Sequence, residues 1–313
     1  MTKQSTERIM MVRPAHFGFN AETAANNSFQ KKEDLGSINE VAMKAREEFD
    51  AFVSTLEANG VEVIVFEDTI APKTPDAVFP NNWISFHEHG SLITYPMYAA
   101  SRREERREDI VNYFMTNYVV ESHQRMETTE EDLRFLEGTG SLILDRVNKI
   151  AYACRSERTD EGLFKKWCEH IDYKGIVFDA VDQNGQAVYH TNVIMCVGTD
   201  FVVLCTESLQ NASQKELLLD TISASGKELI EINLDQVNSF AGNMLEVRNK
   251  TGALYLVLSE RAIQSLDAEQ VETLESYLTL LPVSIPTIET LGGGSARCMM
   301  AEVFLTKKEP IEL

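Results

Sequence analysis

Three side chains of this sequence, Cys298, His190 and Glu137, are of the types that together perform nucleophilic catalysis. Cys298 lies in TLGGGSARCMM, where three consecutive glycines allow the backbone to pass close to a ligand. His190 lies in YHTNV, directly before an apolar run, and imidazole exchanges protons near neutral pH. Glu137 lies in LEGTGSL, between an apolar segment and small residues. A thiol, an imidazole and a carboxylate at one pocket predict attack by the thiol on an electrophilic carbon.

Each of these residues also has a purely structural interpretation. A single cysteine is most often a small buried residue, and a histidine at the start of a buried strand is most often hydrogen-bonded in the core. Glu137 by itself resembles an ordinary surface glutamate. The glycine run and the adjoining Arg297 favour a reactive Cys298. The catalytic interpretation therefore depends on elements that bring the three side chains together.

A weak internal repeat predicts such an arrangement. Five segments begin with an aromatic or apolar residue, continue with small or polar residues and end in a predicted strand: FPNNWISF, LEGTGSLIL, YHTNVIMCV, FAGNMLEV and ARCMMAEVF. They begin at positions 79, 136, 189, 240 and 296, so successive starts are 57, 53, 51 and 56 residues apart. This spacing is typical of a repeated supersecondary unit, although many α/β proteins start a strand about every 50 residues.

Helical patterns recur between the five segments, so a ring of five mixed α/β units fits better than an all-β propeller. Capping boxes at Ser37–Glu40 and Asp267–Gln270 open two helices, which are followed by the strand-like runs VEVIVF and PVSIP. Shorter helical patterns fit residues 103–115, 161–171 and 213–224. In a closed ring the strand starts face a common axis. Their polar residues would meet there: Asn81, Asn82, Glu137, His190, Asn243 and Cys298.

The charge balance predicts a small-molecule partner. The 313 residues include 49 acidic and 29 basic side chains, which gives a net charge of −20 and a pI near 4.7. A nucleic-acid-binding protein needs a basic face, so nucleic acid is not expected. The longest apolar runs, such as residues 201–205 and 254–258, are far shorter than the roughly 20 residues of a membrane-spanning helix. No membrane partner is expected either.

The cysteine pattern predicts reduced thiols and a cytoplasmic location. The five cysteines are odd in number, scattered and without a CxxC pair, so neither a disulfide framework nor a zinc ribbon is expected. The N-terminus shows no apolar stretch typical of a signal peptide. His87 and His89 flank Glu88 on a predicted exposed strand end, but no third metal ligand is near them. We expect no metal and no organic cofactor, because a thiolate and one acid–base group supply the chemistry.

Several motifs together carry a family resemblance. LEGTGSLILDR, IAYACRSERT, YHTNV and LGGGSARCMM resemble the guanidino-group-modifying superfamily of arginine deiminases, dimethylarginine dimethylaminohydrolases and amidinotransferases. The sequence most resembles the bacterial citrulline-utilisation hydrolases of that superfamily, from MVRPAHFGFN to the cysteine motif. The resemblance implies one α/β domain over residues 1–313, a five-bladed pseudo-symmetric ββαβ propeller of the pentein type with its active site on the central axis. It also implies that Cys298 is the nucleophile, His190 the general acid and base, and Glu137 their carboxylate partner.

The resemblance further implies residues for the amino-acid end of a substrate. Asp76 in PDAVFPNNW stands where the dimethylarginine enzymes carry an aspartate that contacts the α-amino group, and Arg102 and Arg158 match their carboxylate-binding arginines. The chemistry agrees, because an arginine can bind a carboxylate through two parallel hydrogen bonds and an aspartate pairs with an ammonium. Without the resemblance, Arg102 would be interpreted as part of a solvated helix face.

Three departures from the family pattern predict the substrate. Asn81-Asn82 stands where relatives carry a carboxylate, Gly293 where the dimethylarginine enzymes carry an aspartate, and Gly140 where the deiminase EGGD motif ends in an acid. Burying a guanidinium without anionic partners is costly, whereas two asparagines suit a neutral ureido group. We therefore expect a hydrolase that converts citrulline to ornithine, ammonia and carbon dioxide through an S-carbamoyl enzyme.

Other functions stay open at this stage. An arginine deiminase or a dimethylarginine-type hydrolase is the main alternative, and an amidinotransferase differs only in using an amine instead of water as acceptor. A non-catalytic amino-acid-binding protein is the alternative from another class, although binding alone requires no nucleophile. The sequence is compatible with a homo-oligomer. The polar, irregular segment 14–36 predicts a mobile lid over the site.

Overall fold

The computed structural model describes residues 3–33 and 35–309. Within them, the strands form five three-stranded sheets. The middle strand of each sheet pairs antiparallel with one neighbour and parallel with the other, and the parallel pair is joined through at least one helix. Four sheets follow one another along the chain: β3–β5 (Ile84–Phe86, Ser91–Thr94, Ser122–Arg125), β6–β8 (Ile143–Asp145, Ile150–Cys154, Lys174–Phe178), β9–β11 (Met195–Val197, Phe201–Leu204, Glu228–Glu231) and β12–β14 (Leu245–Arg248, Leu254–Ser259, Thr279–Val283).

The remaining sheet joins the two ends of the chain. β1 (Arg8–Arg13) lies in its middle, pairs parallel with β2 (Glu62–Glu67) and pairs antiparallel with β15 (Ala301–Glu302). Its strand order β15-β1-β2 therefore repeats the pattern of the other four sheets with strands that are almost 300 residues apart in sequence. The predicted ββαβ repeat is confirmed in all five units.

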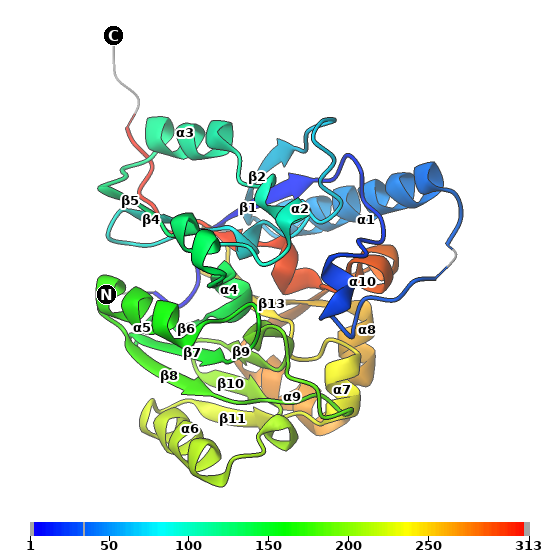
Figure 1. The fold of residues 1–313 in the computed structure, drawn as a ribbon. Helices are drawn as coiled ribbons and strands as arrows, with labels where there is room; N and C mark the ends of the chain where they lie inside the picture. The colour runs from blue at the N-terminus through cyan, green and yellow to red at the C-terminus, as the bar shows by residue number, and fades with distance from the viewer. Residues whose placement is uncertain (1–2, 34, 310–313) are drawn as a thin grey trace.

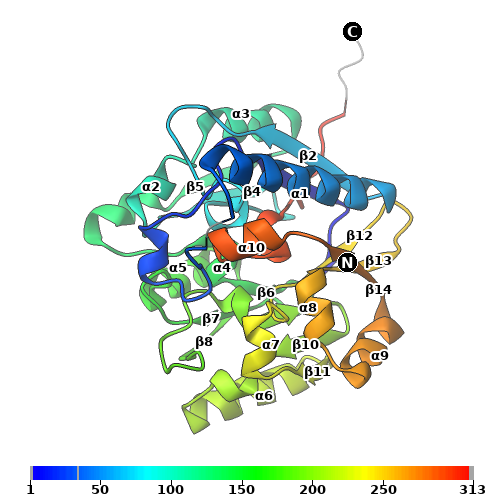
Figure 2. The same ribbon diagram turned by 90° about the vertical axis from the view of Figure 1, so that its right-hand side faces the viewer.

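Helices cover the outside of the sheets, as Figures 1 and 2 show for α1, α3, α5 and α6. α1 (Ile38–Ala58) has the predicted capping box at Ser37, and its apolar stripe packs Phe49 and Phe52 against the core. The other helices are α2 (Ala100–Arg103), α3 (Glu108–Asn117), α4 (Gly138–Ser141), α5 (Glu161–Ile171), α6 (Ala212–Ala224), α7 (Leu234–Asn238), α8 (Glu260–Ser265), α9 (Ala268–Tyr277) and α10 (Pro286–Gly292). None of the helices in the described residues is long and apolar enough to span a bilayer.

Two predicted elements differ from the structure. The helix predicted over residues 103–115 is divided into α2 and α3, because the charged stretch before Ile110 has no apolar side chain that could hold a helix against the core. The strand predicted at PVSIP is β14, which begins three residues earlier, at Thr279. β14 pairs only with β13, so Pro282 can lie within it without interrupting a second ladder.

Short turns precede the first strand of each unit and lie close together in the middle of the molecule. They are the 3-10 turns η2 (Pro80–Asn82), η4 (Thr191–Val193) and η6 (Ala296–Met299), the short helix α4, and residues 240–244 before β12. α4 contacts both η2 and η4, and η2 also contacts η6. These are the five segments of the sequence repeat, so the repeat places their polar side chains in one region.

Candidate active site

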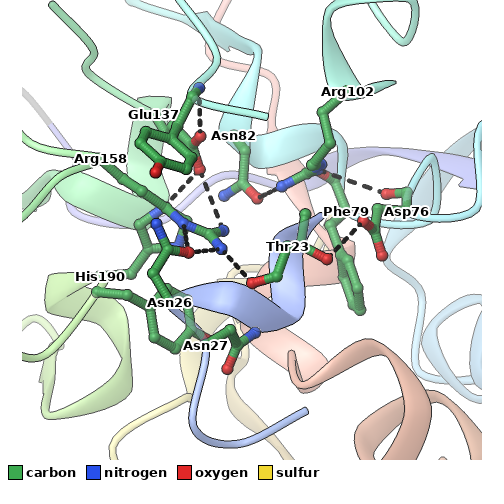
Figure 3. A network of polar contacts seen from close by, with 12 residues as sticks. Thr23, Asn26, Asn27, Asp76, Phe79, Asn82, Arg102, Glu137, Arg158 and His190 are labelled. Carbon is green, nitrogen blue, oxygen red and sulfur yellow. Dashed lines mark hydrogen bonds and ion pairs between the residues drawn. The ribbon is translucent and has the colours of Figure 1, made fainter. Parts of the chain in front are cut away.

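A cavity lies where these turns meet. Six residues predicted from the sequence line it: Asp76, Asn82, Arg102, Arg158, His190 and Cys298. The rest of its wall comes from residues 20–31, from Phe79 and Tyr189, and from the glycine run 292–294. Figure 3 shows how the polar side chains around it converge from different units.

The Cys298 thiol is buried and receives two amide hydrogen bonds. Nδ2 of Asn192 lies 3.3 Å from Sγ, and Nδ2 of Asn243 lies 3.2 Å from it. The other four cysteines are also free and buried, but they do not line the cavity. Burial raises the pKa of three of them to about 12: Cys154, Cys168 and Cys196. Cys298 is therefore the cysteine with access to a ligand.

His190 faces the cavity, and Glu137 lies directly behind it. Nε2 of His190 is 2.8 Å from Oε2 of Glu137, so Nε2 carries the hydrogen and Nδ1 keeps its lone pair. Burial lowers the pKa of His190 to about 4, although Glu137 acts in the opposite direction. Burial raises the pKa of Glu137, but Arg158 and the bond from His190 outweigh it and bring the value to about 2. At neutral pH the pair is an imidazole base oriented by a carboxylate.

Gly140 allows Asn82 and His190 to approach each other. A Cβ at this position would lie 2.5 Å from Nδ2 of Asn82 and 2.7 Å from Nδ1 of His190. No side chain fits there while these two nitrogens stay in place. Position 140 therefore has room only for glycine in this arrangement of Asn82 and His190.

The amide of Asn82 has a fixed orientation. Its Oδ1 accepts a hydrogen bond from Nη1 of Arg102 at 2.7 Å, and its Nδ2 donates to Oδ1 of Asn81 at 3.0 Å. Glu105 holds the other edge of the Arg102 guanidinium, 2.9 Å from Nε and 2.8 Å from Nη2. All of these side chains are buried. The Asn82 group that lies beside His190 is therefore an N–H donor, not an acceptor.

Asp76 offers the cavity an unused acceptor. Its Oδ2 accepts hydrogen bonds from Nδ2 of Asn20 at 2.7 Å and Oγ1 of Thr23 at 3.2 Å. Its Oδ1 is buried and has no hydrogen-bond partner among the described residues. Burial raises the pKa of Asp76, while Arg102 and Arg158 act in the opposite direction. A buried carboxylate oxygen without a donor is costly, and a ligand ammonium in the cavity would supply one.

Residues 20–31 form one wall of the cavity and hold Arg158. Nη2 of Arg158 donates to the carbonyl of Thr23 at 3.0 Å, and Nε donates to Oδ1 of Asn26 at 3.0 Å. The same stretch docks beside α10, where Nδ2 of Asn27 donates to the carbonyl of Gly293 at 3.2 Å (Figure 2). The predicted lid segment thus lies at the site, and its mobility stays a prediction.

Gly293 lies where this wall meets the glycine run. Its φ is +64°, in the left-handed region that favours glycine. A Cβ at this position would lie 2.6 Å from Nδ2 of Asn27 and 2.7 Å from the backbone nitrogen of Gln30. The aspartate that the family resemblance leads one to expect at this position would not fit while residues 20–31 stay in place.

Comparison with known proteins gives the family. The family model described as "N,N dimethylarginine dimethylhydrolase, eukaryotic" matches residues 13–305. The chain belongs to this family. A search of curated protein sequences found no match.

Solved structures share the fold of this dimethylarginine dimethylhydrolase family member. Apo ArgZ, an arginine dihydrolase from the ornithine–ammonia cycle in cyanobacteria, superposes with a TM-score of 0.74 at 18% identity. This match covers 97% of our chain but only 41% of the ArgZ chain. The N-terminal domain of ArgZ bound to product superposes with a TM-score of 0.72 at 18% identity, and that match covers 97% of our chain and 98% of the ArgZ domain. A dimethylarginine dimethylaminohydrolase variant, captured as an adduct with S-methyl-L-thiocitrulline, is covered completely, with 96% of this chain matched, a TM-score of 0.65 and 16% identity.

Two of the predicted binding residues of this family member lie differently from expectation. Asn81 is completely buried behind Asn82 and is not part of the cavity wall, because adjacent side chains of the turn η2 point in different directions. Arg102 does line the cavity, but Glu105 and Asn82 occupy both edges of its guanidinium. Arg102 is therefore not a solvated surface residue, and its guanidinium group has no free edge for bidentate binding of a substrate carboxylate.

His87 and His89 lie in different environments. The prediction that both lie on an exposed strand end is wrong for His87, which is buried and 2.8 Å from Oγ of Ser85 through Nε2. Burial lowers the pKa of His87, and His89 is exposed on the following turn. Among the described residues, no group of three histidine, cysteine, aspartate or glutamate side chains is placed to bind a metal ion.

Sequence reasoning did not assign roles to Asn192, Asn243 or Glu105. A signal for the two asparagines was present: Asn82, Asn192 and Asn243 are each the fourth residue of a repeat segment, in FPNN, YHTN and FAGN. Equivalent positions of a repeat reach equivalent places around the site. Glu105 had no such signal, because the surrounding SRREERR is typical of an exposed, charged stretch.

Proposed function

We propose that this protein is a cysteine-dependent hydrolase of the ureido group of citrulline. The observation that carries the proposal is the set of polar groups beside His190 in the cavity, which offers a neutral imidazole and the amide donor of Asn82. The lining carboxylate with an unpaired oxygen, Asp76, lies on the other side of the group of side chains in Figure 3. Both oxygens of Glu137 are engaged, Oε1 by the backbone nitrogen of Tyr98 at 2.9 Å and Oε2 by His190. Family membership and the shared fold support a hydrolase acting on a guanidino-type amino acid.

A citrulline molecule would match the polar groups of the cavity from end to end. The unpaired Oδ1 of Asp76 would accept a hydrogen bond from the α-ammonium. Arg158 would bind the α-carboxylate through Nη1, which is not used by residues 20–31 and lies 3.6 Å from Oε2 of Glu137. Nδ2 of Asn82 would donate to the ureido oxygen, so Arg102 would act by orienting Asn82 and not by binding substrate directly.

The reaction would proceed in two steps through Cys298. His190 takes the proton of the Cys298 thiol at Nδ1, and the resulting thiolate attacks the ureido carbon. The same proton then passes from Nδ1 to the departing side-chain nitrogen, which releases ornithine and leaves an S-carbamoyl enzyme. Water then gives a proton to His190 and attacks the thioester-like carbon, and the Cys298 thiolate departs. The product is carbamate, which decomposes to ammonia and carbon dioxide. Glu137 keeps the imidazole oriented in both steps and stabilises its protonated form.

A second candidate is a hydrolase of arginine or a methylated arginine. The description of the family model names dimethylarginine, and ArgZ, which shares the fold, is an arginine dihydrolase. Against it stands the arrangement beside His190, where a guanidinium would meet the N–H donor of Asn82 and the neutral acceptor Nδ1 of His190 in place of a carboxylate. An amidinotransferase or a protein that only binds amino acids is supported by no observation of its own.

Incubation with L-citrulline, L-arginine and asymmetric dimethylarginine, followed by mass spectrometry of the products, tests the proposal. We expect ornithine and ammonia from citrulline, with kcat/KM at least about 100-fold above that of either cation, because mispaired buried polar groups discriminate strongly. Arginine or dimethylarginine turned over as fast as citrulline would contradict the substrate. A folded protein that turns over none of the three would contradict the hydrolase, and faster release of ornithine with an added amine would indicate a transferase.

We also infer that the five units close into a five-bladed propeller within one domain. Pairing of β15 with β1 supports closure, because it joins the end of the chain to its beginning. Contacts between neighbouring sheets support it as well, since β15 contacts β3, β6 contacts β9 and β12 contacts β9. Five free, buried cysteines support a reducing compartment, and we propose the cytoplasm.

A further inference from the structure

The sulfur of Cys298 is surrounded by amide donors that come from two other units of the fold. Nδ2 of Asn192 and Nδ2 of Asn243 lie 3.3 Å and 3.2 Å from Sγ, and all three side chains are buried. We propose that Asn192 and Asn243 are catalytic residues that stabilise the Cys298 thiolate and aim it into the cavity. The proposal rests on the proposed function only in that Cys298 is the nucleophile, and it is independent of which amino acid is the substrate.

The orientation of Asn243 is determined by the backbone. Its Oδ1 accepts a hydrogen bond from the backbone N–H of Arg297 at 3.1 Å, and this bond directs Nδ2 toward Sγ. The same Nδ2 donates to the carbonyl of Asn192 at 3.0 Å, which is the other acceptor within its reach. A reversed amide would place two N–H donors against each other at Arg297. The backbone of the turn that carries Cys298 therefore fixes the orientation in which Asn243 donates a hydrogen bond to the sulfur.

Asn192 adds the second donor from the turn η4. Its Oδ1 is buried without a hydrogen-bond partner, so among the described residues the bond from Nδ2 to Sγ is the one hydrogen bond of this amide group. The bond to Sγ must therefore offset the free-energy cost of burying this polar amide. A hydrogen bond to a charged acceptor stabilises more than one to a neutral acceptor. A neutral thiol could donate its hydrogen to Oδ1 of Asn243, 3.6 Å from Sγ, and its sulfur would accept the two N–H groups only weakly. A thiolate accepts both N–H groups at once.

In the part of the chain that the structure describes, no cationic side chain has a hydrogen bond or ion pair with the thiol. The charged and titratable groups that line the cavity with Cys298 are His190, Tyr189, Arg158, Arg102 and Asp76, while Glu137 lies behind His190. The Arg158 and Arg102 guanidinium groups are bound by residues 20–31, Glu105 and Asn82. The neighbouring Arg297 turns away, with Nη2 2.9 Å from Oε2 of Glu302 and Nη1 2.9 Å from the carbonyl of Met300. The two amides are thus the donors placed directly at the sulfur.

Titration of the thiolate by its ultraviolet absorbance tests the proposal without any substrate. The signal of each protein is taken as the difference from the same protein carrying Cys298→Ser, which removes the contribution of the other cysteines. The variants are Asn192→Ala and Asn243→Asp, and Asn211→Ala, which removes an exposed amide at the start of α6, is the matched control. Asn192→Ala is the variant least disruptive to folding, since its oxygen has no partner to lose. Alkylation by iodoacetamide, followed peptide by peptide, gives the same midpoint, and slow labelling of the four other cysteines shows that each variant is folded.

We expect the midpoint for Cys298 to rise by about one to two pH units in Asn192→Ala and at least as much in Asn243→Asp, because a hydrogen bond to a charged group is worth about a tenfold to hundredfold change in equilibrium. Turnover at neutral pH should fall by about the same factor and recover at higher pH, with KM nearly unchanged. Midpoints that coincide with the wild type in both variants would overturn the proposal. So would a midpoint that rises in His190→Gln and not in the asparagine variants, since the imidazole would then be the stabilising group. If the asparagine variants showed these shifts in midpoint but the wild type did not turn over citrulline, only the proposed substrate would be contradicted.

Discussion

Asn82 illustrates, at the scale of single residues, how the orientation of one amide can select a substrate. Arg102 takes its oxygen, so the group left for a ligand is an N–H donor. Asn82→Asp keeps an oxygen for Arg102 and replaces the donor by a second, negatively charged oxygen. We expect kcat/KM for citrulline to fall by about 100-fold or more and that for arginine to rise, because the ureido oxygen loses its donor and the guanidinium gains an anion.

Steady-state kinetics on both substrates measure this change. Asn211→Asp is the control, since it makes the same change of charge at an exposed helix N-cap where aspartate serves equally well. If Asn82→Asp left the ratio of the two kcat/KM values where it is in the wild type, the role given to the asparagine would be wrong.

His190 links the chemistry of the site to the stability of the fold. Burial lowers the pKa of His190 from 6.5 to about 4, so below pH 6.5 the unfolded chain takes up a proton at this residue before the folded protein does. The stabilisation from a neutral His190 is complete above pH 6.5 and is lost as the pH falls through 4. Relative to His190→Gln, the wild type should lose about 3 kcal/mol of unfolding free energy between pH 7 and pH 4.

Urea unfolding of both proteins across this pH range gives that difference. The comparison with His190→Gln removes the contributions of other buried groups, such as Asp76, whose pKa is raised by burial and which therefore acts in the opposite direction. A difference that does not change with pH would show that His190 titrates in the folded protein as it does in the unfolded chain.

At the scale of elements, the cavity depends on how residues 20–31 fit against the glycine run. Gly293→Ala adds a Cβ that would lie 2.6 Å from Nδ2 of Asn27, whereas Gly185→Ala adds one at a similar positive φ with nothing within 4 Å. Both substitutions carry the backbone cost of about 1 to 2 kcal/mol for a left-handed alanine. Only Gly293→Ala should also displace the wall, so we expect it to raise KM for citrulline by about tenfold or more while Gly185→Ala leaves KM unchanged.

Thermal unfolding separates the shared backbone cost from the displacement of the wall. Equal losses of stability together with equal KM values in the two variants would show that residues 20–31 do not shape the cavity. A rise in KM confined to Gly293→Ala would support the wall as part of the binding site.

At the scale of the whole molecule, the sheet β15-β1-β2 connects the nucleophile to the beginning of the chain. Cys298 lies just before β15, whose Ala301 pairs with Met10 of β1, and the buried residue Val303 follows. A chain that ends at Met300 keeps Cys298 but loses this pairing and the burial of the apolar side chains beyond it. We expect its unfolding free energy to fall by at least about 3 kcal/mol and its activity to be lost.

The matched control is a chain that ends at Glu309, which retains β15 and the buried residues after it. Chemical unfolding followed by circular dichroism, together with citrulline turnover, compares the two truncated proteins. Full activity and an unchanged unfolding midpoint in the chain that ends at Met300 would mean that the last strand does not hold the nucleophile in place.

Local patterns in the sequence determined the elements of this protein and the residue types at its centre. The capping boxes at Ser37 and Asp267 begin α1 and α9 as predicted, since a cap and an apolar stripe involve residues only a few positions apart. The five repeat segments identified the strand starts for the same reason. Cys298, His190 and Glu137 stood out because each lies at an unusual position within such a segment.

Only the tertiary structure decided which polar atoms meet and which are already engaged. Asn192 and Asn243 reach the thiol from two other units, and Glu105 turns inward to bind Arg102, although its own neighbourhood in sequence is charged like a surface. The two bonds to the thiol join residues 106 and 55 positions apart, and the direction of an amide depends on all of its neighbours at once. Glu105 and Arg102 are only three positions apart, but the fold decides that this pair is buried. Short-range patterns carry no record of those partners, so the donor character of the site emerges only when the five units are assembled.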